Sequence, residues 1–172
     1  GKVYGEIETA YAFADKAEIT VYADEKEQTS AQFRVENGRV RYSVSVKNNP
    51  EIDKINLWSP EKPYLYGIRY RIYKGDELLD EIVSRFGMRK ISVENGIICL
   101  NNKPYYQKLI LDQGYFGDGG LTALSVDQLK ETIVLMKQAG FNGARKHQKI
   151  EDPYFYYFAD ELGFLTWLEM PS

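Results

Sequence analysis

The stretch that most constrains the fold is residues 125–171, where two amphipathic segments alternate with two short apolar runs. The first segment, 125–139, begins with Ser125, a favourable N-cap, and precedes Gly140, which suits the left-handed turn after a helix. Its apolar residues recur at helical spacing. They are Leu129, Ile133, Leu135 and Met136. We therefore predict a helix over 125–139.

The two apolar runs, 141–144 and 164–168, are predicted to be buried strands. A second helix is expected over 153–162, with acids and Pro153 at its start and Gly163 after its end. Because only short loops join these segments, their order predicts a right-handed crossover between parallel strands.

Polar side chains follow both predicted strands. Arg145, Lys146, His147 and Gln148 follow the first, and Glu169 follows the second. Working residues of parallel α/β units lie beyond the carboxyl ends of the strands, so we predict a site there. The alternative stays open that Glu169 only pairs with Arg145 and that His147, the single histidine, is structural.

The first half of the chain has the alternating pattern of antiparallel strands, with turn signals at 37–38 and 75–76 and a break at 48–50. The turn at 37–38 predicts a hairpin between 31–35 and 39–46. Other strands are expected at 17–23, 66–73 and 78–86, and before Trp58. About seven short strands favour a sandwich, with Trp58 in its core.

Residues 91–101 are predicted to form a small hairpin, with Cys99 buried. A buried strand is expected over 105–111, with Asp112 at its carboxyl end. Asp112 could hydrogen-bond a polar ligand or cap the glycine-rich loop that follows, and both readings stay open. We expect that loop to form a site rim, with Tyr115 and Phe116 accessible.

Four stretches carry a family resemblance. They are 57–66 (Leu-Trp-Ser-Pro-Glu-Lys-Pro-Tyr-Leu-Tyr), 86–91 (Phe-Gly-Met-Arg-Lys-Ile), 100–104 (Leu-Asn-Asn-Lys-Pro) and 140–145 (Gly-Phe-Asn-Gly-Ala-Arg), the last followed by Asp-Glu-Leu-Gly at 160–163. In this order they resemble glycoside hydrolase family 2, which comprises β-galactosidases, β-glucuronidases and β-mannosidases.

The resemblance implies a multidomain β plus α/β chain. An antiparallel immunoglobulin-like β-sandwich over 1–91 would precede a partial (β/α)8 barrel over 92–172, with about three strands and two helices. It also implies a fragment of a retaining glycosidase that cleaves terminal β-glycosidic bonds, such as β-galactosides. The acid/base and nucleophile glutamates are expected beyond Ser172, so we expect no catalytic residue and no turnover here.

Residue by residue, Arg145 matches the arginine that holds the nucleophile carboxylate in the family. The family then usually reads Arg-x-Ser-His-Tyr-Pro, so His147 falls on the serine and Gln148 on the histidine. The family's Arg-Gly-x-x-x-His segment is also altered, at 109–114. We assign substrate contacts to Asp112, Arg145, His147 and Gln148, and a contacting or orienting role to Glu169.

Charge and composition argue against two other classes, nucleic-acid-binding and membrane-spanning proteins. A net charge of −3 without a basic patch argues against nucleic acid, and no long apolar run predicts a membrane span. We expect no cofactor and no metal in this chain, although a cation in the full-length parent stays open. Carbohydrate is the expected partner, with self-association through the incomplete barrel. The alternative function is a non-catalytic carbohydrate-binding or interaction sandwich.

Overall fold

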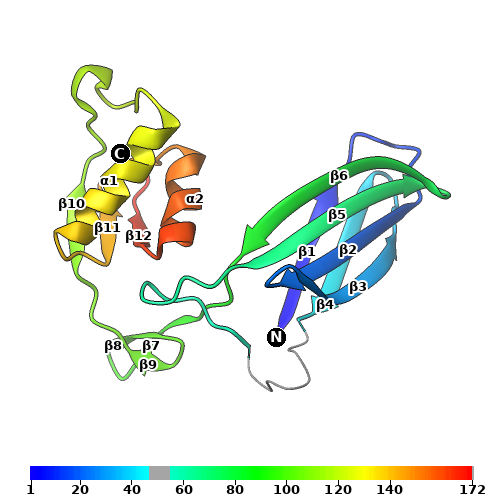
Figure 1. Cartoon of the computed structure of the whole chain (residues 1–172), viewed down its shortest axis with the longest axis horizontal. Coiled ribbons are helices and arrows are strands. Elements are labelled where there is room, and N and C mark those ends of the chain that lie inside the picture. The colour runs from blue at the N-terminus through cyan, green and yellow to red at the C-terminus, as the bar shows by residue number, and fades with distance from the viewer. Residues whose placement is uncertain (47–54, 172) are drawn as a thin grey trace. The chain divides into compact units, whose positions relative to one another are not determined.

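The computed structural model of the chain describes residues 1–46 and 55–171. It divides into two compact units, Gly1–Asn56 with Leu65–Met88, and Leu57–Tyr64 with Arg89–Ser172. The chain is mostly β-structure with two α-helices (Figure 1). The break expected at 48–50 lies outside the described residues.

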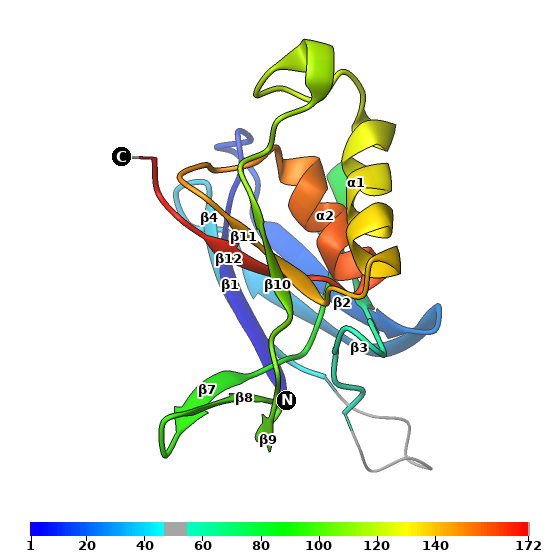
Figure 2. The ribbon, with the colours of Figure 1, turned by 90° about the vertical axis from the view of Figure 1, so that its left-hand side faces the viewer.

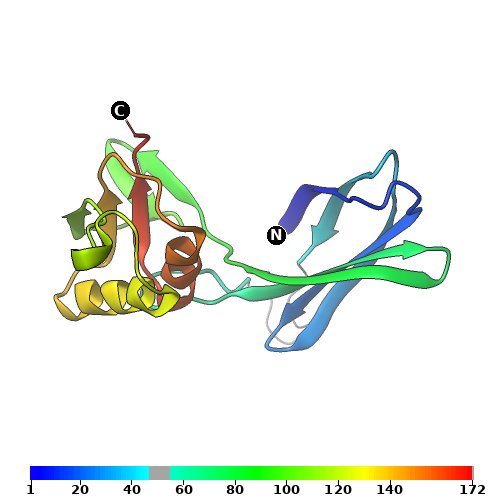
Figure 3. The same ribbon diagram turned by 90° about the horizontal axis from the view of Figure 1, so that it is seen from above.

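The first unit consists of two antiparallel sheets. Its strands are β1 (Lys2–Glu8), β2 (Lys16–Ala23), β3 (Lys26–Arg34), β4 (Arg39–Ser45), β5 (Tyr66–Lys74) and β6 (Glu77–Phe86). One sheet has the order β3-β2-β5-β6 and the other pairs β1 with β4, and Figure 3 shows them as separate layers. Ala17, Val40 and Ile72, from three different strands, meet in one buried cluster between the layers. No strand forms at 55–58, where the sequence suggested one.

The turn at Asn37 and Gly38 forms as predicted, with φ angles of 52° and 73°. The two backbone bonds between Glu36 and Arg39 close it at 2.9 and 3.0 Å. However, β3 pairs with β2 and β4 pairs with β1, so the predicted hairpin between β3 and β4 is wrong. The turn instead carries the chain from one sheet to the other, because turn residues fix the local bend and not the strand partners.

The second unit contains a small antiparallel sheet and a parallel one. The first comprises β7 (Ile91–Glu94), β8 (Ile97–Leu100) and β9 (Lys103–Pro104), and it buries Cys99 as expected. The parallel sheet has the order β10-β11-β12, formed by Leu109–Asp112, Gly143–Lys146 and Leu165–Leu168. The parallel crossover predicted from the sequence is confirmed.

Helices α1 (Val126–Gln138) and α2 (Pro153–Leu162) lie on one face of the parallel sheet (Figure 2). A short 3-10 helix, η1 (Gly117–Gly119), lies in the loop between β10 and α1. Ser125 caps α1 by accepting a hydrogen bond from the backbone of Gln128 at 3.2 Å, as predicted. Leu129 and Ile133 pack in the core with Ala144 of β11, whereas Leu135 is 63% exposed and was wrongly expected inside.

The parallel strand β10 begins four residues later than predicted. The side chain of Asn142 explains this start, because it binds the preceding backbone at two points. Its Oδ1 accepts from the Lys108 amide at 2.7 Å, and its Nδ2 donates to the Tyr106 carbonyl at 2.9 Å. The irregular segment before β10 is therefore tied to the start of β11.

Trp58 is 1% exposed, but it is buried in the second unit and not in the sandwich core, where we expected it. Its indole Nε1 donates to the Asp160 carbonyl at 2.7 Å, and the Arg89 guanidinium lies 4.8 Å from the ring centroid. A large aromatic residue predicts burial, but it does not predict which core receives it.

Candidate functional site

The carboxyl ends of the three parallel strands carry two separate groups of polar side chains. Register places Asp112, Lys146 and Leu168 side by side on neighbouring strands. Side chains alternate between the two faces of a sheet, and Ala144 packs against the helices. Lys146 therefore lies on the helix-covered face, and Arg145 lies on the opposite, open face.

On the open face, Arg145 and Glu169 form an ion pair, with Nε and Oε1 2.5 Å apart. The second oxygen of Glu169 accepts a hydrogen bond from the backbone amide of Gln148 at 3.1 Å. The hydrogen bond from Arg145 is the main reason that the pKa of Glu169 is lowered from its ordinary value, and His147 adds a smaller electrostatic effect. Glu169 is thus an ionised carboxylate that joins the ends of β11 and β12.

His147 lies at the edge of the same group, with its Nε2 atom 4.0 Å from Oε2 of Glu169. Its Nδ1 atom is 3.3 Å from the side-chain Nε2 of Gln113. Its backbone amide donates to the Asp112 carbonyl at 2.9 Å. Gln113 was not among the predicted site residues, although it directly follows Asp112 at the end of β10.

The structure therefore gathers Arg145, His147 and Glu169 in one place, with Gln148 taking part through its backbone. Gln148 has a φ of 54°, so the chain turns sharply there. The arrangement offers a carboxylate, a guanidinium and an imidazole at one sheet edge. These are groups that can hydrogen-bond a polar ligand.

On the helix-covered face, four charged side chains form a second, buried group. Lys146 is fully buried, and its Nζ atom lies 2.7 Å from both Asp112 Oδ2 and Glu151 Oε2. Glu151, whose side chain is 3% exposed, also contacts Lys149 at 3.0 Å. Sequence reasoning missed this group. Its one signal was Lys146, which lies two residues beyond a predicted buried strand.

Asp112 belongs to this buried group and not to the one around Glu169. Its Oδ1 accepts a hydrogen bond from the Gly114 amide at 2.8 Å, and its Oδ2 faces Lys146. The geometry thus favours the loop-capping reading of Asp112. In the same loop, Phe116 is 6% exposed and packs in the core, so its expected exposure at a site rim is wrong, while Tyr115 is 69% exposed.

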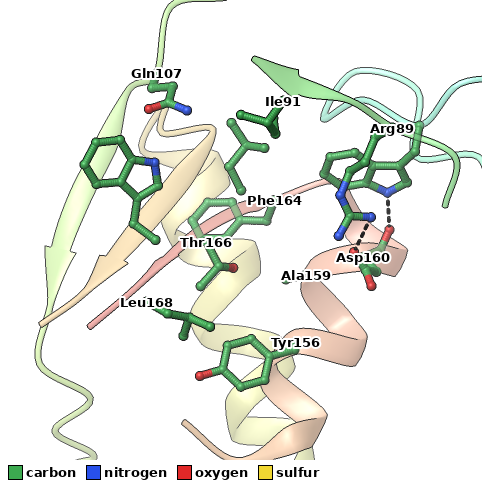
Figure 4. A pocket seen from close by; sticks show the side chains of 12 residues that line it. Arg89, Ile91, Gln107, Tyr156, Ala159, Asp160, Phe164, Thr166 and Leu168 are labelled. Atoms are coloured by element: carbon green, nitrogen blue, oxygen red, sulfur yellow. Dashed lines mark hydrogen bonds and ion pairs between the residues drawn. The ribbon is translucent and has the colours of Figure 1, made fainter. Parts of the chain in front are cut away.

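A separate pocket of about 410 Å³ lies in the second unit, and none of the five predicted site residues lines it. Figure 4 shows Arg89 pointing toward Asp160 at its wall, where the two side chains form an ion pair at 3.2 Å. Another hollow, of about 450 Å³, has Lys149, Glu151 and Asp152 in its lining.

Within 1–46 and 55–171, no group of three or more His, Cys, Asp or Glu side chains is placed to hold a metal ion. In the same residues, neither helix is long and apolar enough to cross a membrane.

The second unit belongs to the class of parallel α/β structures that place polar groups at the carboxyl ends of their strands. The family model described as "Glycosyl hydrolases family 2" matches residues 1–89, and the chain belongs to this family. The resemblance inferred from the sequence motifs is confirmed.

Curated relatives agree with this assignment. A β-galactosidase of Pseudoalteromonas haloplanktis is 34% identical over 109 residues, which are 62% of this chain and 10% of the relative. A β-galactosidase of Halalkalibacterium halodurans is 28% identical over 141 residues, 77% of this chain and 14% of the relative. The chain spans only 10% to 17% of the length of the first curated relatives that it matches.

Solved structures share the fold. β-Glucuronidase 3 of Bacteroides uniformis matches with a TM-score of 0.82 at 22% identity, over 99% of this chain and 21% of that one. A family 2 β-galacturonidase of Eisenbergiella tayi, bound to galacturonate, matches with a TM-score of 0.78 at 24% identity, over 99% and 29%.

Proposed function

We propose that this chain is part of a retaining β-glycosidase. Residues 1–91 would be its immunoglobulin-like sandwich domain, and residues 92–172 the first three strands and two helices of its (β/α)8 barrel. The observation that carries this proposal is the parallel sheet β10-β11-β12, with the Arg145–Glu169 pair at its carboxyl edge. In such barrels the catalytic groups come from the carboxyl ends of several different strands.

The chemistry of hydrolysis supports the view that the two catalytic carboxyl groups lie on later strands and not in this chain. A retaining glycosidase needs two carboxyl groups about 5 Å apart, one a proton donor and the other a nucleophile. At the described strand ends, Glu169 is paired with Arg145, and Asp112 is paired with Lys146. A carboxylate held by a cation is a poor proton donor, and both oxygens of Glu169 and of Asp112 already accept hydrogen bonds within this chain. We therefore assign neither role to them, and the acid/base and the nucleophile would come from outside this chain.

The residues of this chain would then bind and orient. The Arg145 guanidinium presents a planar set of donors, which suits holding a catalytic carboxylate from a later strand. His147 and the backbone turn at Gln148 would contact sugar hydroxyls, and Glu169 would fix Arg145. A β-galactoside or a related β-glycoside is the substrate class that the names of the relatives suggest.

The test uses the full-length parent enzyme with chromogenic β-galactosides and β-glucuronides. Replacing Arg145 with alanine should lower kcat/KM by about a hundredfold, the scale seen when a preorganised electrostatic contact is removed. Replacing Arg41 is the matched control, because it pairs with Glu6 at 2.8 Å on the sandwich surface and should leave the rate unchanged. Equal activity of both variants and the wild type would remove the role proposed for Arg145.

A further inference from the structure

The buried charges below the strand ends form a linear chain of alternating sign. Asp112 contacts Lys146, Lys146 contacts Glu151, and Glu151 contacts Lys149, at distances of 2.7, 2.7 and 3.0 Å. The four side chains are between 0% and 16% exposed. Two acids and two bases sum to zero, so the group is neutral although each charge is largely removed from water.

The last member of this chain holds the loop between β10 and α1. Lys149 Nζ donates to the carbonyl of Gly114 at 3.0 Å and to that of Leu121 at 2.6 Å. It also lies 5.1 Å from the ring centroid of Phe116, which is buried in the same loop. A single ammonium therefore fastens both the start and the far part of residues 113–125.

At Gly114 the loop packs closely against the side chains of Lys149 and Glu151. The φ of Gly114 is +70°, and an added Cβ would lie 2.5 Å from Lys149 Nζ and 2.7 Å from Glu151 Oε2. The loop thus passes directly over the charged chain, with no room for a side chain between them. Gln113, the residue before it, is the one that contacts His147.

We propose that Lys146 is a positioning residue, whose buried ammonium fixes the end of β10 and the loop so that Gln113 stands beside His147. The Gln113 amide donates to Nδ1, which leaves the proton of the neutral imidazole on Nε2, on the side of Glu169. Lys146 thereby sets which imidazole atom is a donor toward a ligand. That the ligand is a sugar rests on the proposed function.

The electrostatics explain why the lysine is needed. Asp112 and Glu151 approach the same ammonium from two segments, and without it two buried carboxylates would face each other. Breaking a buried pair by removing one partner is strongly destabilising, since it leaves an uncompensated charge. The test must therefore remove a charge from both sides.

The double variant Lys146→Met/Asp112→Asn does so. The asparagine Oδ1 can still accept from Gly114, and the Glu151–Lys149 pair remains. Because His147 is the only histidine, the ¹⁵N spectrum of histidine-labelled 172-residue chain contains one imidazole. At a pH where that imidazole is neutral, the wild type should show an unprotonated Nδ1 and a protonated Nε2.

In the double variant we expect shifts averaged between the two tautomers. Lys137→Met is the matched control, because Lys137 also donates to two carbonyls, those of Leu162 and Gly163, but lies away from the strand ends. It should keep the wild-type imidazole signals. Wild-type signals in the double variant would overturn the positioning role.

If the double variant does not fold, Asp112→Asn gives the second measurement. It removes the ion pair through which Lys146 holds the end of β10 and leaves the Lys146–Glu151 and Glu151–Lys149 pairs in place. The tautomer signature should again be lost, and an unchanged signature would overturn the proposal. In the full-length parent, the double variant should lower kcat/KM about tenfold, mainly by raising KM, since Gln113 and His147 would act in binding. A changed imidazole in this chain, with a parent that hydrolyses no glycoside, would support the positioning role and refute the proposed function.

Discussion

Arg145 and Glu169 join the ends of two neighbouring parallel strands through a contact of 2.5 Å between Nε and Oε1. Neither residue is deeply buried, with side chains 45% and 29% exposed. An exposed pair of this kind contributes little to stability, so its consequence is geometric. It fixes the guanidinium at the sheet edge where the other polar groups gather.

The first prediction concerns the titration of Glu169. Its pKa should lie below the ordinary glutamate value of 4.5, because Arg145 and the Gln148 amide stabilise the carboxylate. Because the folded pKa is the lower one, the stabilisation by the pair is present above pH 4.5 and is lost as the pH falls through the folded pKa. Arg145→Met should raise the Glu169 pKa, as measured by ¹³C NMR of the carboxyl group.

The control for this titration is Arg39→Met, which removes the pair with Glu8 on β1 and should leave the Glu169 signal in place. A Glu169 pKa that does not move in Arg145→Met would show that the two side chains do not interact in solution.

The second prediction compares two glycines with positive φ. Gly163 (φ +73°) ends α2, and a Cβ there would clash with the Pro60 carbonyl; Gly140 (φ +92°) follows α1 with open space around it. Gly140→Ala should cost about 1 kcal/mol, the strain of a left-handed residue. Gly163→Ala should cost about 1–3 kcal/mol more, as for overpacking. Guanidinium unfolding curves of both variants check this, and equal losses would contradict the contact with Pro60.

The helices and turns were predicted best where capping or turn-forming residues mark their ends. The bounds of α2 were predicted correctly, because Asp152 caps its start, Pro153 opens its first turn and Gly163 ends it. Turn-forming residues also predicted the turn at Asn37 and Gly38. The predicted pairing of β3 with β4 was wrong, because strand pairing depends on contacts between residues far apart in the sequence.

The buried group of charged residues around Lys146 could not be predicted in the same way. Arg145 and Lys146 are adjacent in a strand, so they must lie on opposite faces, but the pattern does not say which one is covered. Lysine is almost never fully buried unless it is paired. The partners that permit the burial of Lys146 are Asp112 and Glu151, which precede and follow it in different segments.

The third prediction uses Trp58 to test the core of the second unit. Trp58→Phe removes the 2.7 Å hydrogen bond to the Asp160 carbonyl and leaves space in a buried site. We expect a loss of about 1–3 kcal/mol in the free energy of unfolding. Trp167 remains as the only tryptophan and reports unfolding by fluorescence.

The control is the replacement of Trp167 by Phe. We expect it to change the free energy of unfolding by less than about 0.5 kcal/mol, because Trp167 is 47% exposed. A similar, small effect of both changes would refute the buried role of Trp58.

The last prediction concerns the open face of the parallel sheet. Leu111, Arg145 and Trp167 are register partners on that face, and Leu111 and Trp167 are both about half exposed. Among the described residues, β10 and β12 are each paired on one side only, so the sheet offers strand edges beside an apolar surface, which favours association with another copy. We expect sedimentation velocity to show a mass that rises with concentration.

Trp167→Lys should shift the distribution toward monomer, because burying an unpaired ammonium in the contact is costly. Tyr4→Lys, at a residue that is 80% exposed on β1, should leave the association unchanged. A monomer at every concentration, or equal loss of association in both variants, would show that this face does not mediate self-association.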